Sequence, residues 1–214
     1  MSKMKKLSAL SVLAAAVIIL MGATSCDPNK KGKKSEEPVV TEAVNVENAI
    51  GIAHEYMNLN YGTGYRWYEC CILMKDYLDE DTDGAVEGVS NVFQVLEPHG
   101  SSIDTHVVLI ATNGENTTVE VKHGFWVEDF PLNEEAIEIT YEQAFERVMA
   151  ANYPKPHSRH CVLRKEVGPV AANTQYIFGN NSAQLYVDAQ TGEVTDTNPV
   201  YDGSGFGMPL GEWP

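Results

Sequence analysis

The chain has 214 residues and a formal net charge of −15 at pH 7, and 43% of its residues are hydrophobic. This length suits one ordinary domain or two small ones. A strongly acidic chain repels the phosphate backbone, so the composition argues against nucleic acid as a partner. It favours cationic partners, Ca²⁺ among them.

The first 25 residues have the pattern of a secretory signal peptide. Three lysines stand within the first six residues, an uncharged run follows over 7–21, and residues 22–25 are Gly-Ala-Thr-Ser. Such signals combine a basic start, a short apolar run and small residues at the cleavage site. Cys26 follows directly, and this junction resembles the lipobox of bacterial lipoproteins. The resemblance implies that Cys26 is lipidated and anchors the chain to a membrane. The alternative is ordinary cleavage that leaves a free thiol.

Residues 26–44 are predicted to form a disordered tether, because they are rich in Lys, Ser, Glu and Pro and contain few apolar residues. The basic part, around 30–34, would lie next to anionic lipid headgroups. No second apolar run of about 18 residues follows the signal. We therefore expect the mature chain to be anchored to the membrane rather than to span it.

Two segments carry the start signal of an amphipathic helix. Asn45 precedes the first and Thr140 precedes the second, where Gln143 completes a capping box. Apolar residues then recur at helical spacing. These are Ala49, Ile50, Ala53, Tyr56 and Met57 in the first segment and Ala144, Phe145, Val148 and Met149 in the second. We expect each helix to pack one apolar face against a sheet.

A strand is predicted after each helix, at Cys71–Asp76 and at Cys161–Glu166, and a candidate β-hairpin follows each strand. The hairpins turn at an Asn-Gly and an Asn-Asn pair, and both residue types tolerate the positive φ of tight turns. The hairpin strands are 107–111 with 118–121 and 175–178 with 183–187.

These elements predict an α+β fold of two helix-plus-antiparallel-sheet units, residues 45–130 and 131–214, related by internal duplication. The first unit would carry an insertion near 77–104, with a strand near 89–96. The second would end in an extended tail. The alternative is two unrelated stretches that obey the same local rules.

The second unit resembles a PepSY-type domain over Ile139–Val194. Its opening, Ile-Thr-Tyr-Glu-Gln-Ala from Ile139, is similar to the capped helix start of that family. Its close from Asp188, Asp-Ala-Gln-Thr-Gly-Glu, is similar to the turn after the final strand. In that turn Asp188 can accept backbone hydrogen bonds and Gly192 permits positive φ. The first unit lacks this ending. The family is associated with protease propeptides, with inhibition and with periplasmic binding, and it is not known for active sites.

A candidate calcium loop begins at Asp79. Carboxylates at its first, third and fifth positions and a glycine at its sixth match the start of an EF-hand loop. The candidate ligands are Asp79, Asp81, Asp83 and Glu87. The twelfth position, which takes a bidentate Glu, is Ser90. The alternative is an acidic turn without a metal.

The cysteines and histidines form no recognisable catalytic or zinc motif. A disulfide between Cys71 and Cys161 would form if two sheets packed face to face; the alternative is that these thiols and Cys70 are buried and unreactive. The six histidines are expected at the surface or in turns. Trp67 and Trp126 are expected in the core.

The sequence thus predicts a non-enzymatic, lipid-anchored binding protein of the bacterial cell envelope. We expect it to recognise a protein or peptide through a sheet face or an exposed strand edge, with protease inhibition as one form of that recognition. The alternatives are a calcium-binding envelope protein that uses the 79–83 loop and an enzyme with an unrecognised Cys or His site. The sequence leaves open whether the protein faces the periplasm or the cell surface.

Overall fold

The computed structural model describes residues 43–79, 81–99 and 102–201. The predicted signal peptide, Cys26 and most of the tether lie outside the described residues, as does the tail after residue 201. Among the described residues, no helix is long and apolar enough to cross a membrane.

Both predicted helices begin at the residues expected to cap them. Helix α1 spans Val46–Tyr61, and the Oδ1 atom of Asn45 accepts a hydrogen bond from the N–H of Asn48 at 2.7 Å. Helix α2 spans Tyr141–Ala150, where Thr140 and Gln143 form the predicted capping box. These local bonds satisfy N–H groups that an uncapped first turn would leave unpaired.

The strands include every predicted one, with different bounds at several ends. They are β1 (Tyr65–Met74), β2 (Val86–His99), β3 (Ser102–Asn113), β4 (Asn116–His123), β5 (Asp129–Phe130), β6 (His160–Glu166), β7 (Gln175–Asn180), β8 (Ala183–Asp188) and β9 (Val194–Thr195). A short 3₁₀ helix, η1 (Glu134–Ala136), precedes α2. Both predicted hairpins are confirmed, as β3–β4 and β7–β8.

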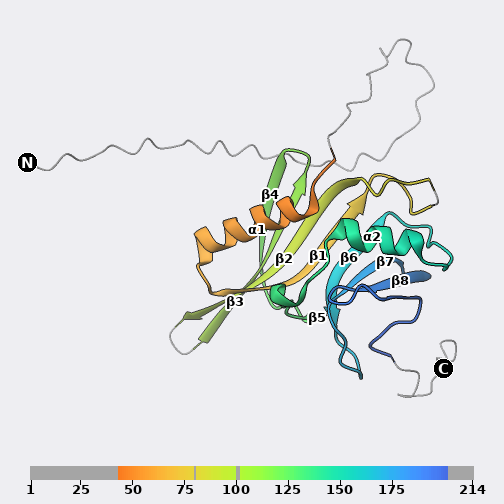
Figure 1. The fold of residues 1–214 in the computed structure, drawn as a ribbon. Coiled ribbons are helices and arrows are strands. Elements are labelled where there is room, and N and C mark those ends of the chain that lie inside the picture. The colour runs from red at the N-terminus through yellow and green to blue at the C-terminus, as the bar shows by residue number, and fades with distance from the viewer. Residues whose placement is uncertain (1–42, 80, 100–101, 202–214) are drawn as a thin grey trace, which may run out of the picture. The chain divides into compact units, whose positions relative to one another are not determined.

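The described strands form one antiparallel sheet in the order β4-β3-β2-β1-β6-β7-β8-β9, and β5 pairs with the end of β6. Strands β1 and β6 meet in its middle, with Ile72 opposite Cys161. Both helices cover the same face of this sheet, as Figure 1 shows, and their apolar sides form one core with it. The opposite face carries no helix of the described residues, and we call it the helix-free face.

A β-bulge in β1 decides which side chains point to which face. Trp67 pairs with Phe93, but Glu69 already pairs with Val92, so Tyr68 is the extra residue. The side-chain alternation therefore changes at Tyr68. As a result, Trp67 packs in the helix-side core, while Glu69 points to the helix-free face.

The α+β class is confirmed, but the arrangement of the two predicted units differs from the expectation. The units share one sheet, because β1 and β6 pair along their edges. The strand predicted near 89–96 belongs to β2, which lies between β1 and β3. The segment interpreted as an insertion thus supplies an interior strand of the sheet.

The turn predicted from Asp188 is confirmed. The Oδ1 atom of Asp188 accepts hydrogen bonds from the N–H groups of Gln190 and Thr191 at 2.8 and 2.9 Å. Gly192 has a φ of 74°. The local sequence is sufficient for this turn, because the carboxylate and the glycine supply its two special requirements.

Asn91 on β2 is fully buried on the helix side, and neither polar atom of its side-chain amide has a hydrogen-bond partner among the described residues. Replacing it by valine, which has a similar volume and suits a strand, is expected to raise the free energy of unfolding by about 1–3 kcal/mol, because the desolvation penalty disappears. Urea denaturation measures this change. Asn116→Val, at an exposed position on β4, is the control and is expected to stay within about 0.5 kcal/mol of the wild type. A destabilised Asn91→Val protein would contradict the prediction.

Candidate functional site

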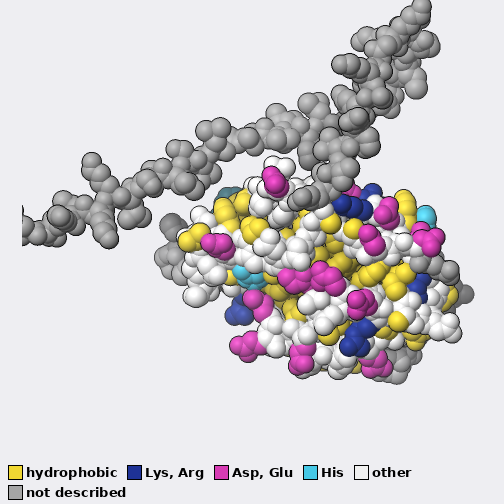
Figure 2. Space-filling model, turned by 45° about the horizontal axis from the view of Figure 1, so that its top comes forward, with side chains coloured by type: hydrophobic (Ala, Val, Ile, Leu, Met, Phe, Trp, Pro, Cys, Tyr) yellow, Lys and Arg dark blue, Asp and Glu magenta, His cyan; other side chains and the backbone are white. Residues whose placement is uncertain are grey.

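A cleft of roughly 250 Å³ opens on the helix side, above the pair of central strands. Its walls come from α1 and from the segment that joins η1 to α2. Its lining residues are Glu47, Ile50, Trp67, Glu134, Ile137, Glu138, Ile139, Thr140, Leu163 and Tyr176. Figure 2 shows acidic and hydrophobic side chains next to one another on this side of the molecule. Within the described residues, the lining contains no Lys, Arg or His.

The acidic side chains of this cleft come from three different elements. Glu47 stands in the first turn of α1, and its Oε1 atom accepts a hydrogen bond from the N–H of Tyr141 at 3.1 Å. Burial raises the pKa of Glu47, and the nearby Glu142 raises it further. Glu134 and Glu138 are exposed at the rim. One oxygen of Glu47 is therefore engaged by the first residue of α2, whereas the exposed carboxylates of Glu134 and Glu138 can be reached by a ligand.

His54 lies close to this cleft, on α1. Its Nδ1 atom is 3.6 Å from Glu134 Oε1, and its ring meets those of Trp67 and Phe93 edge-on. Burial lowers the pKa of His54, and Glu134 opposes that shift. This histidine is packed against the core, which differs from the expected surface position. Trp67 is 4% exposed, as predicted for a core residue.

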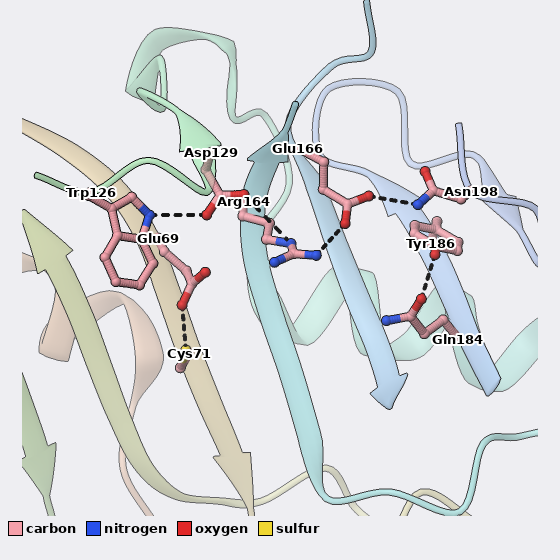
Figure 3. A network of polar contacts seen from close by, with 9 residues as sticks. All are labelled: Glu69, Cys71, Trp126, Asp129, Arg164, Glu166, Gln184, Tyr186 and Asn198. Atoms are coloured by element: carbon pink, nitrogen blue, oxygen red, sulfur yellow. Dashed lines mark hydrogen bonds and ion pairs between the residues drawn. The ribbon is translucent and has the colours of Figure 1, made fainter. Parts of the chain in front are cut away.

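A polar network occupies the helix-free face, as Figure 3 shows. Strand β1 contributes Glu69, whose Oε1 accepts a hydrogen bond from the thiol of Cys71 at 2.9 Å. Strand β6 contributes Arg164, which pairs with Glu166 and lies 3.8 Å from Asp129. The network thus places three carboxyl groups around one guanidinium group.

The segment of residues 124–130 brings Asp129 and Trp126 to this network. The indole N–H of Trp126 donates a hydrogen bond to Asp129 Oδ2 at 3.2 Å. The backbone N–H of Trp126 donates a hydrogen bond to Gln94 Oε1 at 3.2 Å. Trp126 is half-buried, so its predicted core position is wrong, because this segment runs along the helix-free face.

Burial and neighbouring charge alter the titration of this network. Burial raises the pKa of Asp129 to about 6 and Glu69 adds to the rise, while Trp126 and Arg164 oppose it. Burial and Glu69 together raise the pKa of Cys71. A thiol with a raised pKa is a poor nucleophile at neutral pH, so this environment disfavours nucleophilic attack by Cys71.

The predicted Cys71–Cys161 disulfide is wrong for this structure, because the cysteines of the described residues, Cys70, Cys71 and Cys161, are free. The prediction assumed two sheets packed face to face, whereas β1 and β6 are neighbours in one sheet. Ile72 stands opposite Cys161, so Cys71 and Cys161 point to opposite faces. Cys70 and Cys161 are buried on the helix side, and burial raises their pKa values well above the usual range.

The candidate calcium ligands make bonds within their own turn and to a neighbouring strand. Asp79 Oδ1 accepts from the N–H of Asp81 at 3.1 Å, and Asp83 Oδ1 accepts from the N–H of Ala85 at 2.8 Å. Glu87 lies on β2 and pairs with Arg159. Within the ranges that the structure describes, no three potential metal ligands gather around one point. Calcium binding stays a prediction.

Sequence reasoning missed the carboxylates of both sites. Glu134 lies in η1 and Glu138 lies in the segment that joins η1 to α2, and neither belongs to an element predicted from the sequence. Arg164 and Glu166 alternate along a predicted strand, which was a signal that both point to one face. No sequence pattern indicates that Asp129 lies next to Arg164 and Glu166.

Comparison with family models, curated proteins and solved structures finds no match to this chain.

Proposed function

We propose that this chain is a lipid-anchored binding protein of the bacterial cell envelope that recognises a basic segment of a peptide or partner protein in the helix-side cleft. The observation that carries this proposal is the cleft itself, where Glu47, Glu134 and Glu138 surround an apolar lining. An apolar cleft with a few charged groups selects ligands that combine both properties. The net charge of −15 would attract such cationic partners over longer distances.

A lysine or arginine side chain fits this chemistry. Its aliphatic stem would lie along Ile50 and Ile137, and its charged group would reach the carboxylates of Glu134 and Glu138 at the rim. The described residues of the lining include no Lys, Arg or His, and the histidine beside Glu134, His54, has a pKa lowered by burial, so a cationic ligand would supply the missing positive charge. A neutral apolar peptide would bury part of that rim without compensation, which costs free energy.

The order of elements supports a finer part of the proposal, that the chain contains two PepSY-like units. Helix α1 is followed by β1 to β4, and α2 is followed by β6 to β9, with β1 and β6 paired in the middle. In this correspondence β2 matches β7 and β3 matches β8. The sequence pattern instead matches the β3–β4 hairpin to β7–β8. The two matches differ by one strand, because the sequence pattern treats β2 as part of an insertion.

The envelope location rests on the signal-like residues 1–25 and on Cys26, and protease inhibition rests on the resemblance of residues 139–194 to PepSY domains. If inhibition is the role, a basic segment of a protease would occupy the cleft. A protease gene next to the gene for this chain would identify the enzyme to test. No inhibition of that enzyme by the purified protein would remove this part of the proposal.

Binding of a basic peptide tests the central claim. The probes are two fluorescent capped pentapeptides of valine and leucine around a central residue, lysine in one and norleucine in the other. We expect the full chain, purified in detergent, to bind the lysine peptide more tightly. The double variant Glu134→Gln, Glu138→Gln is expected to weaken binding by about tenfold or more, as the loss of ion pairs in a partly desolvated cleft predicts. Fluorescence anisotropy measures both affinities.

The matched control removes the same charge elsewhere. Glu115 and Glu120 are exposed around the β3–β4 hairpin, outside the cleft lining. The double variant Glu115→Gln, Glu120→Gln is expected to bind the lysine peptide as the wild type does. Equal weakening in both double variants would show an effect of net charge alone and would contradict a specific cleft. Equal affinity for the lysine and norleucine peptides would contradict the basic specificity.

A further inference from the structure

The 124–130 segment has an unusual distribution of side chains. Its large apolar residues Phe125, Val127 and Phe130 are 65%, 79% and 48% exposed. The one residue of the segment that is buried is Asp129, whose side chain has no exposed surface. A surface segment usually packs its apolar side chains inward and leaves its carboxylates in water. In this segment the side chain that is buried against the sheet is the carboxyl group of Asp129. Buried acids combined with exposed apolar side chains break the usual pattern, and such departures often mark functional positions.

The neighbours of Asp129 leave its buried carboxyl incompletely bonded. Oδ2 accepts a hydrogen bond from Trp126, but Oδ1 has no hydrogen-bond partner among the described residues. Arg164 Nε lies 3.8 Å from Oδ1, too far for a hydrogen bond, and it too is buried without a hydrogen-bond partner in the described part of the chain. The Nη2 atom of the Arg164 guanidinium group pairs instead with Glu166. The basic group of the network is therefore already engaged by another carboxylate.

A second buried carboxyl group lies beside Asp129. Glu69 is 7% exposed and lies beside Asp129 in Figure 3, and its negative charge raises the pKa of Asp129. Two neighbouring carboxyl groups form a hydrogen bond when one of them carries a proton. The titratable and charged groups that face Asp129 are Glu69 and Cys71 on β1 and Arg164 and Glu166 on β6. Gln94 on β2 and Trp126 in the segment itself are neutral.

We propose that Glu69 and Asp129 form a proton-binding pair that controls how tightly the 124–130 segment is held on the helix-free face. One proton taken from solvent binds the carboxylate of Asp129, and the resulting O–H donates a hydrogen bond to the neighbouring carboxylate of Glu69. Release of this proton to solvent leaves two buried negative charges side by side, with Arg164 already paired to Glu166. Their repulsion loosens the segment and gives access to the surface beneath it. This pair lies on the opposite face from the cleft and does not depend on the proposed function.

The raised pKa of Asp129 sets the direction of the effect. Its folded value of about 6 lies above the ordinary value of 3.8. The folded state therefore binds this proton more strongly than the unfolded state, and the stabilisation is complete below pH 3.8 and lost as the pH rises through about 6. Acidification holds the segment in place, and neutral pH releases it.

Hydrogen exchange of residues 124–130 in the full chain tests the proposal, read by mass spectrometry and corrected for the intrinsic pH dependence of exchange. We expect protection to fall by up to about tenfold between pH 5 and pH 7.5, because Asp129 changes charge within this window. Asp129→Asn still accepts the hydrogen bond from Trp126 but cannot ionise. It is expected to keep the same protection at both pH values. Glu120→Gln, an exposed carboxylate elsewhere, is the matched control and should retain the wild-type pH dependence.

Infrared difference spectroscopy supplies a second readout that a purely structural role would not change. The wild type is expected to show a protonated carboxyl C=O band that disappears as the pH rises through about 6, and this band should be absent in Asp129→Asn. Glu69→Gln is the second variant, should Asp129→Asn fail to fold, and it is also expected to abolish the pH dependence of protection. Protection that is independent of pH in the wild type, or that stays pH-dependent in a folded Asp129→Asn or Glu69→Gln protein, would overturn the proposal.

Discussion

Phe178→Ala is expected to lower the free energy of unfolding by about 3–5 kcal/mol, the usual cost of removing a buried aromatic ring. Phe178 is fully buried on β7 and lies opposite Cys161 on one side and Leu185 on the other. Its ring also stacks near Tyr141 at the start of α2, with centroids 6.1 Å apart. The ring joins the sheet to a helix, so neighbouring side chains cannot close the cavity without moving one of these elements. Urea denaturation followed by circular dichroism measures the change.

Phe125→Ala is the matched control for this prediction, because it removes the same atoms from a side chain that is 65% exposed. We expect its free energy of unfolding to stay within about 0.5 kcal/mol of the wild type. A Phe178→Ala protein as stable as Phe125→Ala would mean that the core assigned to β7 and α2 is incorrect.

Gly179→Ala is expected to destabilise the protein by about 2–4 kcal/mol, through backbone strain and a steric clash. Gly179 has a φ of 130°, a region that side chains other than glycine rarely adopt. A Cβ atom built at this position would lie 2.1 Å from the carbonyl oxygen of Ala183. That oxygen belongs to the paired strand of the β7–β8 hairpin and cannot move aside without breaking the hairpin register.

Gly51→Ala provides the control of opposite sign. Gly51 lies on α1, is exposed, and has no atom within 4 Å of a built Cβ. Alanine in a helix interior is favoured over glycine by roughly 0.5–1 kcal/mol, so we expect the melting temperature to rise. Thermal melts of both variants make the comparison. A melting temperature for Gly179→Ala equal to that of the wild type would show that the hairpin has another backbone conformation.

Local elements were predictable because their signals are short in sequence. Thr140 and Gln143 cap α2 through bonds across three residues, and Asp188 forms its turn with the residues directly after it. Hairpin turns depend on the same short range. The strand near 89–96 was also found, but its place in the sheet was not, because alternating hydrophobicity does not say which strands are neighbours.

The candidate sites depended on contacts between distant residues, which one sequence does not reveal. Glu47 reaches Tyr141 across 94 positions in the chain. Asp129 meets Glu69 because the bulge at Tyr68 turns that glutamate to the helix-free face. A single extra residue in a strand reverses the direction of every side chain beyond it, so no count from the sequence alone could place Glu69.

The sequence by itself determined the acidic charge, the signal-like start with Cys26, the α+β class, the helix caps and the hairpin turns. These depend on composition and on bonds between residues a few positions apart. Only the tertiary structure decided that β1 and β6 join both halves into one sheet, that Cys71 and Cys161 point to opposite faces, and that Glu69 lies beside Asp129. The register of strands far apart in the chain is chosen by the packing of the whole core, which no local pattern encodes.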